Sequence, residues 1–235
     1  MRVLLTRPDM DSRAVADVLA ARGIEAVLAP LLSIAPVANA ELDLDGAQAV
    51  LVTSANGARA LADATPRRDL TVLAVGRGSA DAARDAGFER VESADGDVAA
   101  LAALARVRCD PAAGALVHVS GSVSAGDLAG VLGAAGFEVR RAVLYCATPA
   151  TTLPEAARQA LRAGWLDAAL FYSPRTAATF AALVTDAGVE EACKSVDALC
   201  LSAAVADALF PLPFAAVKVA TRPDQDALLT LLDSR

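Results

Sequence analysis

Short runs of apolar residues alternate along this chain with segments in which apolar residues recur every three or four positions. The short runs predict strands at 2–6, 24–28, 47–53, 70–75, 115–119, 138–145, 168–172, 198–201 and 216–220. The periodic segments predict helices from 8 to a stop at Gly23, then at 55–62, 79–86, 98–104, 124–135, 153–162, 174–185, 203–209 and 224–232. Because strands and helices alternate strictly and the turns are short, we expect an α/β fold with parallel sheets and helices on both faces.

The alternation is also duplicated. In the first half it is carried by VLLTRPDMDSRAVADVL, VLVTSANGARALAD and VLAVGRGSADAARDAGF, and it returns in the same order as ALVHVSGSVSAGDLAGVL, ALFYSPRTAATFAAL and ALCLSAAVADAL. Each segment has an apolar run, a turn of small polar residues and a helix-like part, which indicates an internal duplication of about 100 residues. Two similar sheets with matching turns predict two domains and a ligand bound in a cleft between them.

Two segments, 31–43 and 145–155, lack this alternation and carry proline and small residues. They occupy equivalent positions in the two halves, so we interpret them as linkers through which the chain crosses twice between domains. The expected division is one discontinuous domain, 1–35 plus 150–235, and one continuous domain, 38–145, with linkers at 32–37 and 146–152.

Composition limits the class of protein. Hydrophobic residues make up 55% of the chain and aromatic residues only 4%, so we expect a core of Ala, Val and Leu. No apolar run has the length of a membrane span and no signal peptide is visible, which predicts a cytoplasmic protein without a membrane partner. The net charge of −7 argues against nucleic acid as a partner but is compatible with a small anion held by a local field. No large apolar surface pattern argues for more than a monomer.

Cysteine and histidine give little sign of catalytic or metal chemistry. The four cysteines form no CxxC pair, and we interpret them as reduced structural thiols. The single histidine, His118, lies in the strand-like ALVHVS, which suits a half-buried strand position, with a catalytic base as the alternative. No Cys/His cluster is present, so we expect no metal.

The candidate chemistry lies in the turns that follow the strands. Open parallel sheets bind ligands beyond the carboxyl ends of their strands, and the free N–H groups of helix N-termini bind anions. The residues expected at these ends are Arg7, Ser54, Asn56, Gly57, Arg77, Ser79, Ser120, Ser122, Ser173, Arg175 and Ser202. Serine is also an ordinary helix cap, so each hydroxyl alone suits capping as well as ligand contact.

These turns do not match the known motifs for nucleotide binding or hydrolysis. The segment 76–79 lacks the third glycine of a dinucleotide fingerprint because Asp81 occupies that position, and neither a P-loop nor a GxSxG elbow occurs. Tyr145 ends a strand just before the second linker, where its phenol either donates a hydrogen bond into the cleft or packs at an interface. Tyr172 is expected in the core. The predicted site is therefore rich in cations and hydroxyls and poor in acids and bases.

In the order and spacing of these signals, the chain resembles the uroporphyrinogen-III synthase family over nearly its whole length. The resemblance is carried by VLLTRP…LAARGIEAVLAPLLSI, VLVTSANGARAL, LAVGRGSADAARDAGF, the strand ending in Tyr145, FYSPRTAATF, the Ser202 turn and VATRPDQDALLTLL. It implies two flavodoxin-like α/β domains with parallel sheets, joined by a two-stranded linker, and an enzyme without cofactor or metal. It also places the family's cleft tyrosine at Tyr145, as the catalytic residue, and its cleft serines at Ser54 and Ser173.

The resemblance further implies an activity. The chain would cyclise hydroxymethylbilane, a tetrapyrrole with many carboxylates, to uroporphyrinogen III, with loss of water and inversion of the last pyrrole ring. Tyr145 would protonate the leaving hydroxyl, while backbone amides and Arg7, Arg77 and Arg175 would hold carboxylates. Hydroxymethylbilane synthase would be a transient partner.

Two turns depart from the family pattern. Ala203 and Ala204 occupy a turn where a hydroxyl is common, and the segment 122–126 has no basic residue where one is common. These departures keep a second class open, a non-catalytic two-domain binding module for a tetrapyrrole or another polycarboxylate. A regulatory α/β module is a third class, but it would not need duplicated polar turns.

Overall fold

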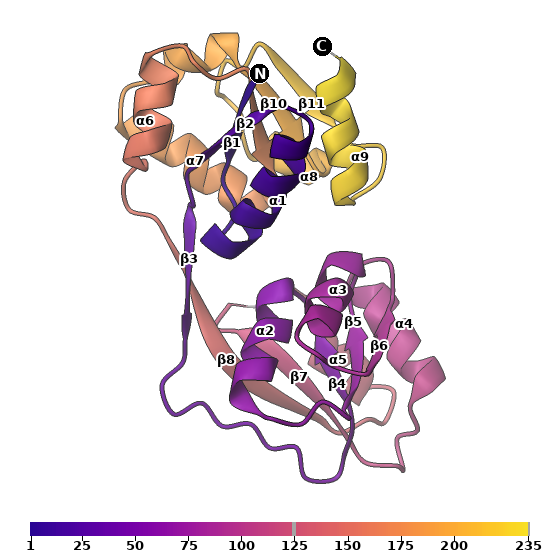
Figure 1. The fold of residues 1–235 in the computed structure, drawn as a ribbon. Coiled ribbons are helices and arrows are strands. Elements are labelled where there is room, and N and C mark those ends of the chain that lie inside the picture. Colours follow the sequence, from indigo (N-terminus) through magenta and orange to yellow (C-terminus); the bar gives the residue numbers. More distant parts are fainter. Residues whose placement is uncertain (124–125, 235) are drawn as a thin grey trace. The chain divides into compact units, whose positions relative to one another are not determined.

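The structure, a computed structural model, describes residues 1–123 and 126–234 and divides into two compact units. Unit 1 contains Met1–Ser33 and the chain from Thr148 onward, and unit 2 contains Ile34–Ala147. In each unit a sheet is flanked by helices, and unit 1 holds both the N-terminal and the C-terminal segment (Figure 1). The predicted α/β class is therefore confirmed.

Unit 1 is built on a five-stranded sheet in the order β2-β1-β9-β10-β11, with every pair parallel. Its strands are β1 (Arg2–Leu5), β2 (Glu25–Leu28), β9 (Ala168–Phe171), β10 (Asp197–Cys200) and β11 (Ala216–Val219). Its helices are α1 (Asp9–Ala21), α6 (Glu155–Arg162), α7 (Pro174–Asp186), α8 (Ala203–Asp207) and α9 (Gln225–Thr230), with 3₁₀ helices η1 (Glu190–Ser195) and η2 (Leu231–Ser234). In chain order this is the flavodoxin arrangement 2-1-3-4-5.

Unit 2 is built on a six-stranded sheet in the order β3-β8-β7-β4-β5-β6. Its strands are β3 (Leu32–Pro36), β4 (Ala47–Val52), β5 (Thr71–Ala74), β6 (Arg90–Ser93), β7 (Ala115–Gly121) and β8 (Val139–Pro149). Its helices are α2 (Ala55–Ala64), α3 (Arg77–Asp85), α4 (Val98–Arg108) and α5 (Leu128–Gly133). The pairs from β8 through β6 are parallel, and β3 is added beside β8.

The two sheets correspond strand by strand. The order β8-β7-β4-β5-β6 in unit 2 matches β2-β1-β9-β10-β11 in unit 1, so β7 corresponds to β1, β4 to β9 and β5 to β10. These are the correspondences that the repeated turns predict. Each sheet thus combines strands from both halves of the sequence, and the chain passes from one unit to the other within β3 and again within β8.

Both faces of each parallel sheet are covered, which explains why the strands are apolar without interruption. In unit 1, α6, α7 and α8 pack on the face that contains Phe171, and α1 and α9 pack on the face that contains Leu170. In unit 2, α2 and α3 cover one face, and α4 and α5 cover the other. No helix in the described part of the chain is long and apolar enough to cross a membrane.

The sequence periodicity misses two of the strands. The segments 31–43 and 145–155, which lack the alternation and are interpreted as linkers, contain β3 and the end of β8, and beside these strands Ala150 N donates to Leu31 O at 2.9 Å. The periodicity missed β3 because it is short, mostly exposed and ends on a proline. It also missed β6, whose sequence RVES is polar, as suits the edge of a sheet. The expected start of the 124–135 helix lies outside the described residues, and the observed helix α5 begins after its cap, Asp127.

The core of unit 1 can be tested at Phe171. This side chain is completely buried and packs edge-on against Phe180, at 5.1 Å between ring centroids, and against Phe214 at 6.1 Å. We expect Phe171→Ala to lower the free energy of unfolding of unit 1 by about 3–5 kcal/mol, because it removes this contact and leaves a cavity. Urea unfolding followed by the fluorescence of Trp165, the only tryptophan and a unit 1 residue, measures the change.

Phe210→Ala is the matched control, since the Phe210 side chain is 85% exposed. It should change the same free energy by less than about 0.5 kcal/mol. Equal losses in the two variants would contradict the packing described for Phe171.

Candidate active site

In each unit, three neighbouring strands end at the same edge of the sheet because they are parallel. They are β1, β9 and β10 in unit 1, and β7, β4 and β5 in unit 2. The turns that follow five of them lead directly into helices α1, α7, α8, α2 and α3. Each edge therefore presents several helix N-termini, whose free N–H groups and positive dipole ends favour an anionic ligand.

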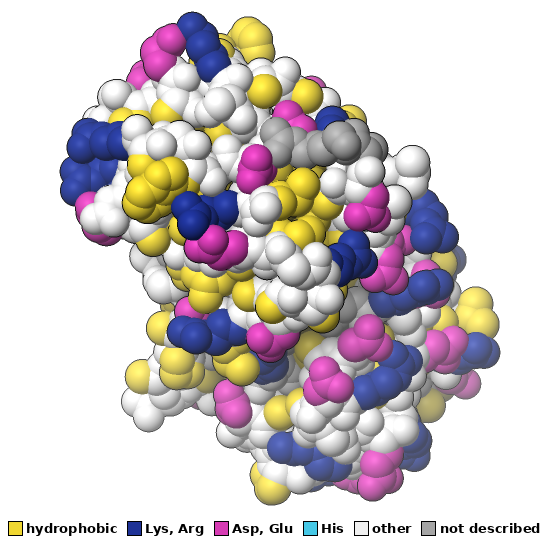
Figure 2. Space-filling view, turned by 45° about the horizontal axis from the view of Figure 1, so that its top comes forward, with side chains coloured by type: hydrophobic (Ala, Val, Ile, Leu, Met, Phe, Trp, Pro, Cys, Tyr) yellow, Lys and Arg dark blue, Asp and Glu magenta, His cyan; other side chains and the backbone are white. Residues whose placement is uncertain are grey.

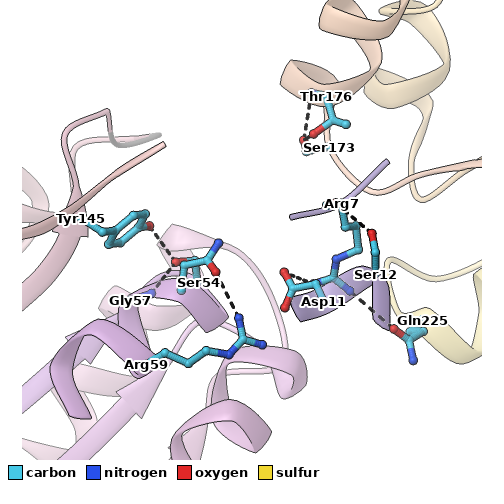
Figure 3. A network of polar contacts seen from close by, with 11 residues as sticks. Arg7, Asp11, Ser12, Ser54, Gly57, Arg59, Tyr145, Ser173, Thr176 and Gln225 are labelled. Carbon is cyan, nitrogen blue, oxygen red and sulfur yellow. Dashed lines mark hydrogen bonds and ion pairs between the residues drawn. The ribbon is translucent and has the colours of Figure 1, made fainter. Parts of the chain in front are cut away.

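In unit 2 the structure brings Ser54 and Tyr145 together (Figure 3). Ser54 caps helix α2, and its Oγ accepts a hydrogen bond from Gly57 N at 3.0 Å. The same Oγ lies 2.8 Å from the Tyr145 hydroxyl, in a hydrogen bond that either oxygen can donate. A capping serine and a phenol thus form one hydrogen-bonded chain that ends at the helix N-terminus, although they are far apart in the sequence.

A break in the β7–β8 ladder directs Tyr145 toward Ser54. Up to Ser120, successive residues of β7 pair one-for-one with residues of β8, and the register then shifts so that Gly121 pairs with Tyr145. Regular alternation would put Tyr145 on the same face as Arg141 and Val143. The extra residue instead turns it to the face that α2 covers, together with the buried Leu144.

A glycine leaves room for this arrangement. A Cβ at Gly121 would lie 2.8 Å from Cε2 of the Tyr145 ring, so the ring occupies the place of a side chain. A Cβ at Gly57, by contrast, would lie at contact distance, 3.4 Å from Ser54 Oγ and 3.4 Å from Val119 O. Glycine at position 121 therefore allows the phenol to lie directly on the strand, where its exposed fraction is 8%.

The other predicted residues of α2 and α3 lie at the same edge. Asn56, in the first turn of α2, accepts a hydrogen bond from Arg59 Nη1 at 3.1 Å, so a guanidinium group contacts this turn of the helix. Arg77 is the first residue of α3, largely exposed, and contacts Asp95 at 3.4 Å, an ion pair of little energetic weight. Ser79 is buried in the first turn of the same helix. The sequence did not single out Arg59, because nothing in its local pattern distinguishes it from a solvated helix residue.

The end of β7 and the start of the turn that follows it are held by a neighbouring strand. Ser120 is buried, and its Oγ accepts a hydrogen bond from Arg141 Nε at 2.9 Å. Arg141 Nη2 also donates to Gly121 O at 3.0 Å and to Ser122 O at 3.5 Å. Ser122 is exposed, and its N–H donates to Tyr145 O at 2.9 Å. Ser120 therefore has a structural partner, whereas the Ser122 side chain faces solvent.

In unit 1 the serines act as caps in the same extended conformation. Ser173 caps α7 by accepting from Thr176 N at 3.2 Å, and its hydroxyl also lies 2.9 Å from Thr176 Oγ1 (Figure 3). Ser202 occupies the cap of α8 without a side-chain cap bond, so its hydroxyl is not used by that helix. Arg175 lies in the first turn of α7 and is half-buried.

Arg7 is fixed by its neighbours in unit 1. Its guanidinium lies 3.1 Å from the buried carboxylate of Asp11, reaches Gln225 Oε1 at 3.5 Å, and stacks 4.5 Å above the Tyr172 ring. Burial raises the pKa of Tyr172 to about 12, although the charge of Arg7 acts in the opposite direction. The Tyr172 ring thus packs against one face of the Arg7 guanidinium, and the positive charge of Arg7 is partly balanced by Asp11.

His118 is a core residue. It points to the face of the unit 2 sheet that carries Leu116, its exposed fraction is 4%, and its Nε2 has no hydrogen-bond partner within the described chain. Burial, and secondarily the charge of Arg141, lower its pKa to about 4. A neutral, enclosed imidazole in mid-strand supports the strand interpretation rather than that of a catalytic base.

Charges of both signs are mixed on the face visible in Figure 2, and the described residues hold no metal cluster. On the face shown in Figure 2, Lys and Arg side chains lie among Asp and Glu side chains, in keeping with the many exposed ion pairs. Within residues 1–123 and 126–234, no group of three His, Cys, Asp or Glu side chains could hold a metal ion. At the two edges, hydroxyls, the Tyr145 phenol, guanidinium groups and backbone N–H groups lie beside two carboxylates that are paired with arginines, Asp11 and Asp95.

Fold and edges together define a two-unit α/β protein whose helix N-termini, hydroxyls and guanidinium groups suit an anionic ligand. A family model described as uroporphyrinogen-III synthase HemD matches residues 13–230. Because the match spans nearly the whole chain, the chain belongs to this family.

Solved structures agree on the fold. A uroporphyrinogen-III synthetase from Helicobacter pylori is similar with a TM-score of 0.64 and 16% identity, covering 100% of this chain and 99% of that chain. A mutant uroporphyrinogen III synthase from the extremely thermophilic bacterium Thermus thermophilus is similar with a TM-score of 0.55 and 20% identity, covering 100% of this chain and 98% of that chain. A comparison with curated proteins found no match.

The burial of His118 predicts a pH dependence of stability. The pKa is about 4 in the folded protein and near 6.5 in the unfolded chain, so the unfolded chain binds the proton more tightly. The contribution of the neutral imidazole to the free energy of unfolding is fully present above pH 6.5 and decreases as the pH falls toward 4. We expect a loss of about 2 kcal/mol between pH 7 and pH 5 that is missing in His118→Leu.

Because the chain has a single histidine, NMR measures this pKa directly. The imidazole signal should titrate with a midpoint near 4. A midpoint near 6.5 would show that the ring is solvated and would contradict the described burial.

Proposed function

We propose that this protein catalyses the cyclisation of hydroxymethylbilane to uroporphyrinogen III, with inversion of the last pyrrole ring and release of water. Family membership supports the activity, and the observation that carries the proposal is the hydrogen-bonded pair of Ser54 and Tyr145 at the N-terminus of α2. This pair supplies an O–H donor at an edge that favours anions, in a site with few other acids or bases.

The geometry suggests how the phenol acts. Ser54 Oγ already accepts the Gly57 N–H, so its own hydrogen is free to be donated to the Tyr145 oxygen. In that orientation the Tyr145 O–H points away from Ser54 and donates to the hydroxyl of the substrate's hydroxymethyl group. Proton transfer breaks the bond between the methylene carbon and this hydroxyl, which leaves as water. The phenolate that remains on Tyr145 is stabilised by the Ser54 hydroxyl and the α2 dipole.

The proton balance then closes within the reaction. Loss of water leaves an electrophilic methylene on the first pyrrole ring, and the last ring attacks it through its substituted carbon. In the spiro intermediate, the bond from this carbon to the methylene bridge of the third ring breaks. The unsubstituted α-carbon of the last ring then bonds to that methylene and gives up its proton to the phenolate. One proton is donated and one is recovered, so the phenol is regenerated at the end of the cycle. The main task of the chain is to hold the substrate so that the substituted carbon attacks.

The polar residues of the two edges are proposed to hold the substrate. Carboxylates suit guanidinium groups and N–H groups at helix N-termini. The proposed substrate-binding residues are Arg7, Ser54, Asn56, Gly57, Arg77, Ser79, Ser120, Ser122, Ser173, Arg175 and Ser202. Support is unequal: Ser122 and Arg77 are exposed at an edge, whereas Ser79 and Ser120 are buried and would act through the backbone of their turns.

Further proposals concern the organisation and setting of the protein. We infer domains at 1–35 plus 150–235 and at 38–145, with linkers at 32–37 and 146–152; the division of contacts between the two units supports this. We also infer a cytoplasmic monomer that meets hydroxymethylbilane synthase transiently.

The activity is tested by supplying hydroxymethylbilane and separating the type III from the type I isomer after oxidation. We expect type III to form, since unassisted closure gives the uninverted ring. Production of type I alone, at the uncatalysed rate, would reject the enzyme. It would leave the binding module for a tetrapyrrole or another polycarboxylate, which equilibrium binding of uroporphyrinogen III would then reveal.

The role of the phenol is tested with Tyr145→Phe. The ring stays in place and Ser54 still caps α2, so the protein should fold while kcat falls on the order of 10²-fold and KM changes little. Tyr172→Phe is the control, because the Tyr172 hydroxyl has no hydrogen-bond partner in the described chain and its ring contact with Arg7 is kept. An unchanged kcat in Tyr145→Phe would remove Tyr145 from the mechanism.

A further inference from the structure

We propose that Arg141 is a positioning residue for Tyr145, acting through residues 120–122, which are the last two residues of β7 and the first residue of the turn after it, together called the 120–122 turn. The inference rests on the proposed function, in which the phenol of Tyr145 donates the proton. Arg141 lies early in β8, opposite His118 of β7, and its side chain extends along β7 toward the end of that strand. The sequence did not single it out, because an exposed basic residue on a strand looks like an ordinary surface cation.

Arg141 holds this turn at consecutive residues. Its Nε donates to Ser120 Oγ at 2.9 Å, and its Nη2 donates to Gly121 O at 3.0 Å and lies 3.5 Å from Ser122 O. A guanidinium is planar and presents its donors in a fixed fork, so these contacts fix both the direction and the distance of the turn. A flexible ammonium group could satisfy only part of them.

The position of the 120–122 turn determines where Tyr145 lies. Gly121 carries the backbone on which the phenol ring rests, since a Cβ there would lie 2.8 Å from Cε2 and 3.3 Å from the hydroxyl oxygen. Ser122 N donates to Tyr145 O at 2.9 Å and closes the ladder beyond the register shift. A displacement of Gly121 would therefore move the ring relative to Ser54, which the hydroxyl contacts at 2.8 Å.

The charge of Arg141 suits this task. Its hydrogen-bond partners are a hydroxyl and two backbone carbonyls, and no carboxylate of the described chain forms an ion pair with it. The positive charge is therefore directed at the carbonyl groups of the turn, which bind it without competing acidic side chains. The segment 122–126 has no basic residue of its own, and Arg141 supplies a cation to this turn from the adjacent strand.

The test compares Arg141→Gln, Arg141→Lys and the control Arg140→Gln. Arg140 is the neighbouring residue of β8, on the opposite face, and its contacts are Glu138 at 2.7 Å, Asp43 at 2.9 Å and Asp45 O at 2.6 Å. Arg140→Gln removes as many contacts of β8 as Arg141→Gln does, but none of them involves the 120–122 turn. Far-ultraviolet circular dichroism checks that all three variants fold.

The first readout does not need activity. The chain has two tyrosines, so protein labelled with 3-fluorotyrosine gives two ¹⁹F signals, and Tyr172→Phe assigns them. Arg141→Gln should shift or broaden the Tyr145 signal and leave the Tyr172 signal in place, while Arg140→Gln should change neither. An unchanged Tyr145 signal in Arg141→Gln would overturn the proposal.

The second readout is the kinetics with hydroxymethylbilane. In Arg141→Gln we expect kcat to fall on the order of tenfold with KM within about a factor of two, because the phenol is misplaced while binding is kept. Arg141→Lys should behave like the glutamine variant, since it keeps the charge but not the fork. A higher KM with unchanged kcat, restored by lysine, would mean that Arg141 binds a substrate carboxylate and would overturn the positioning role.

The two proposals fail separately. If the wild-type protein forms no type III isomer, the proposed function is rejected, and the ¹⁹F signals still decide whether Arg141 holds Tyr145 in place.

Discussion

Parallel pairing of the central strands is the constraint on which the rest of this structure depends. A parallel strand can return to its neighbour only through a crossover, and here the crossovers are helices that begin at the carboxyl ends of the strands. The helix N-termini that follow the strands of a unit therefore face the same edge. Since the N–H groups at that edge must be satisfied, the turns carry serine and aspartate caps, and the same N–H groups suit an anionic ligand. The parallel pairing of the strands thus accounts both for the capping residues and for the preference of the edge for an anionic ligand.

The duplication gives this constraint a second consequence. Each half of the sequence contributes strands to both sheets, so neither half can complete a sheet alone. The chain must cross between units twice, and both crossings occur inside strands β3 and β8. Strand β8 therefore has two tasks. Its first part completes the unit 2 sheet, and its later part, beyond the register shift, carries Tyr145 on the α2 face.

Within unit 2, one extra residue in β8 determines which face of the sheet carries the phenol of Tyr145. The shift in the β7–β8 ladder puts the phenol beside the cap of α2, and glycine at position 121 makes room for the ring. Arg141 lies on the other face of the same two strands and holds the turn that carries this glycine. At the equivalent cap of unit 1, the Ser173 hydroxyl bonds to Thr176 and, among the described residues, to no phenol. The two edges are therefore alike in backbone and different in side-chain chemistry.

The sequence by itself determined the alternation of strands and helices, the duplication, and the turns that carry the caps, because apolar periodicity and capping residues are local signals. It also marked Ser54, Ser173 and Tyr145 through a family resemblance. Only the tertiary structure decided that Tyr145 meets Ser54, that Asp11 partly balances Arg7, and that Arg141 supplies a cation to the turn after β7. These contacts depend on strand register and on side chains that are distant in sequence. A one-residue shift in register reverses the face of a strand without changing its periodicity, so no local pattern could have shown it.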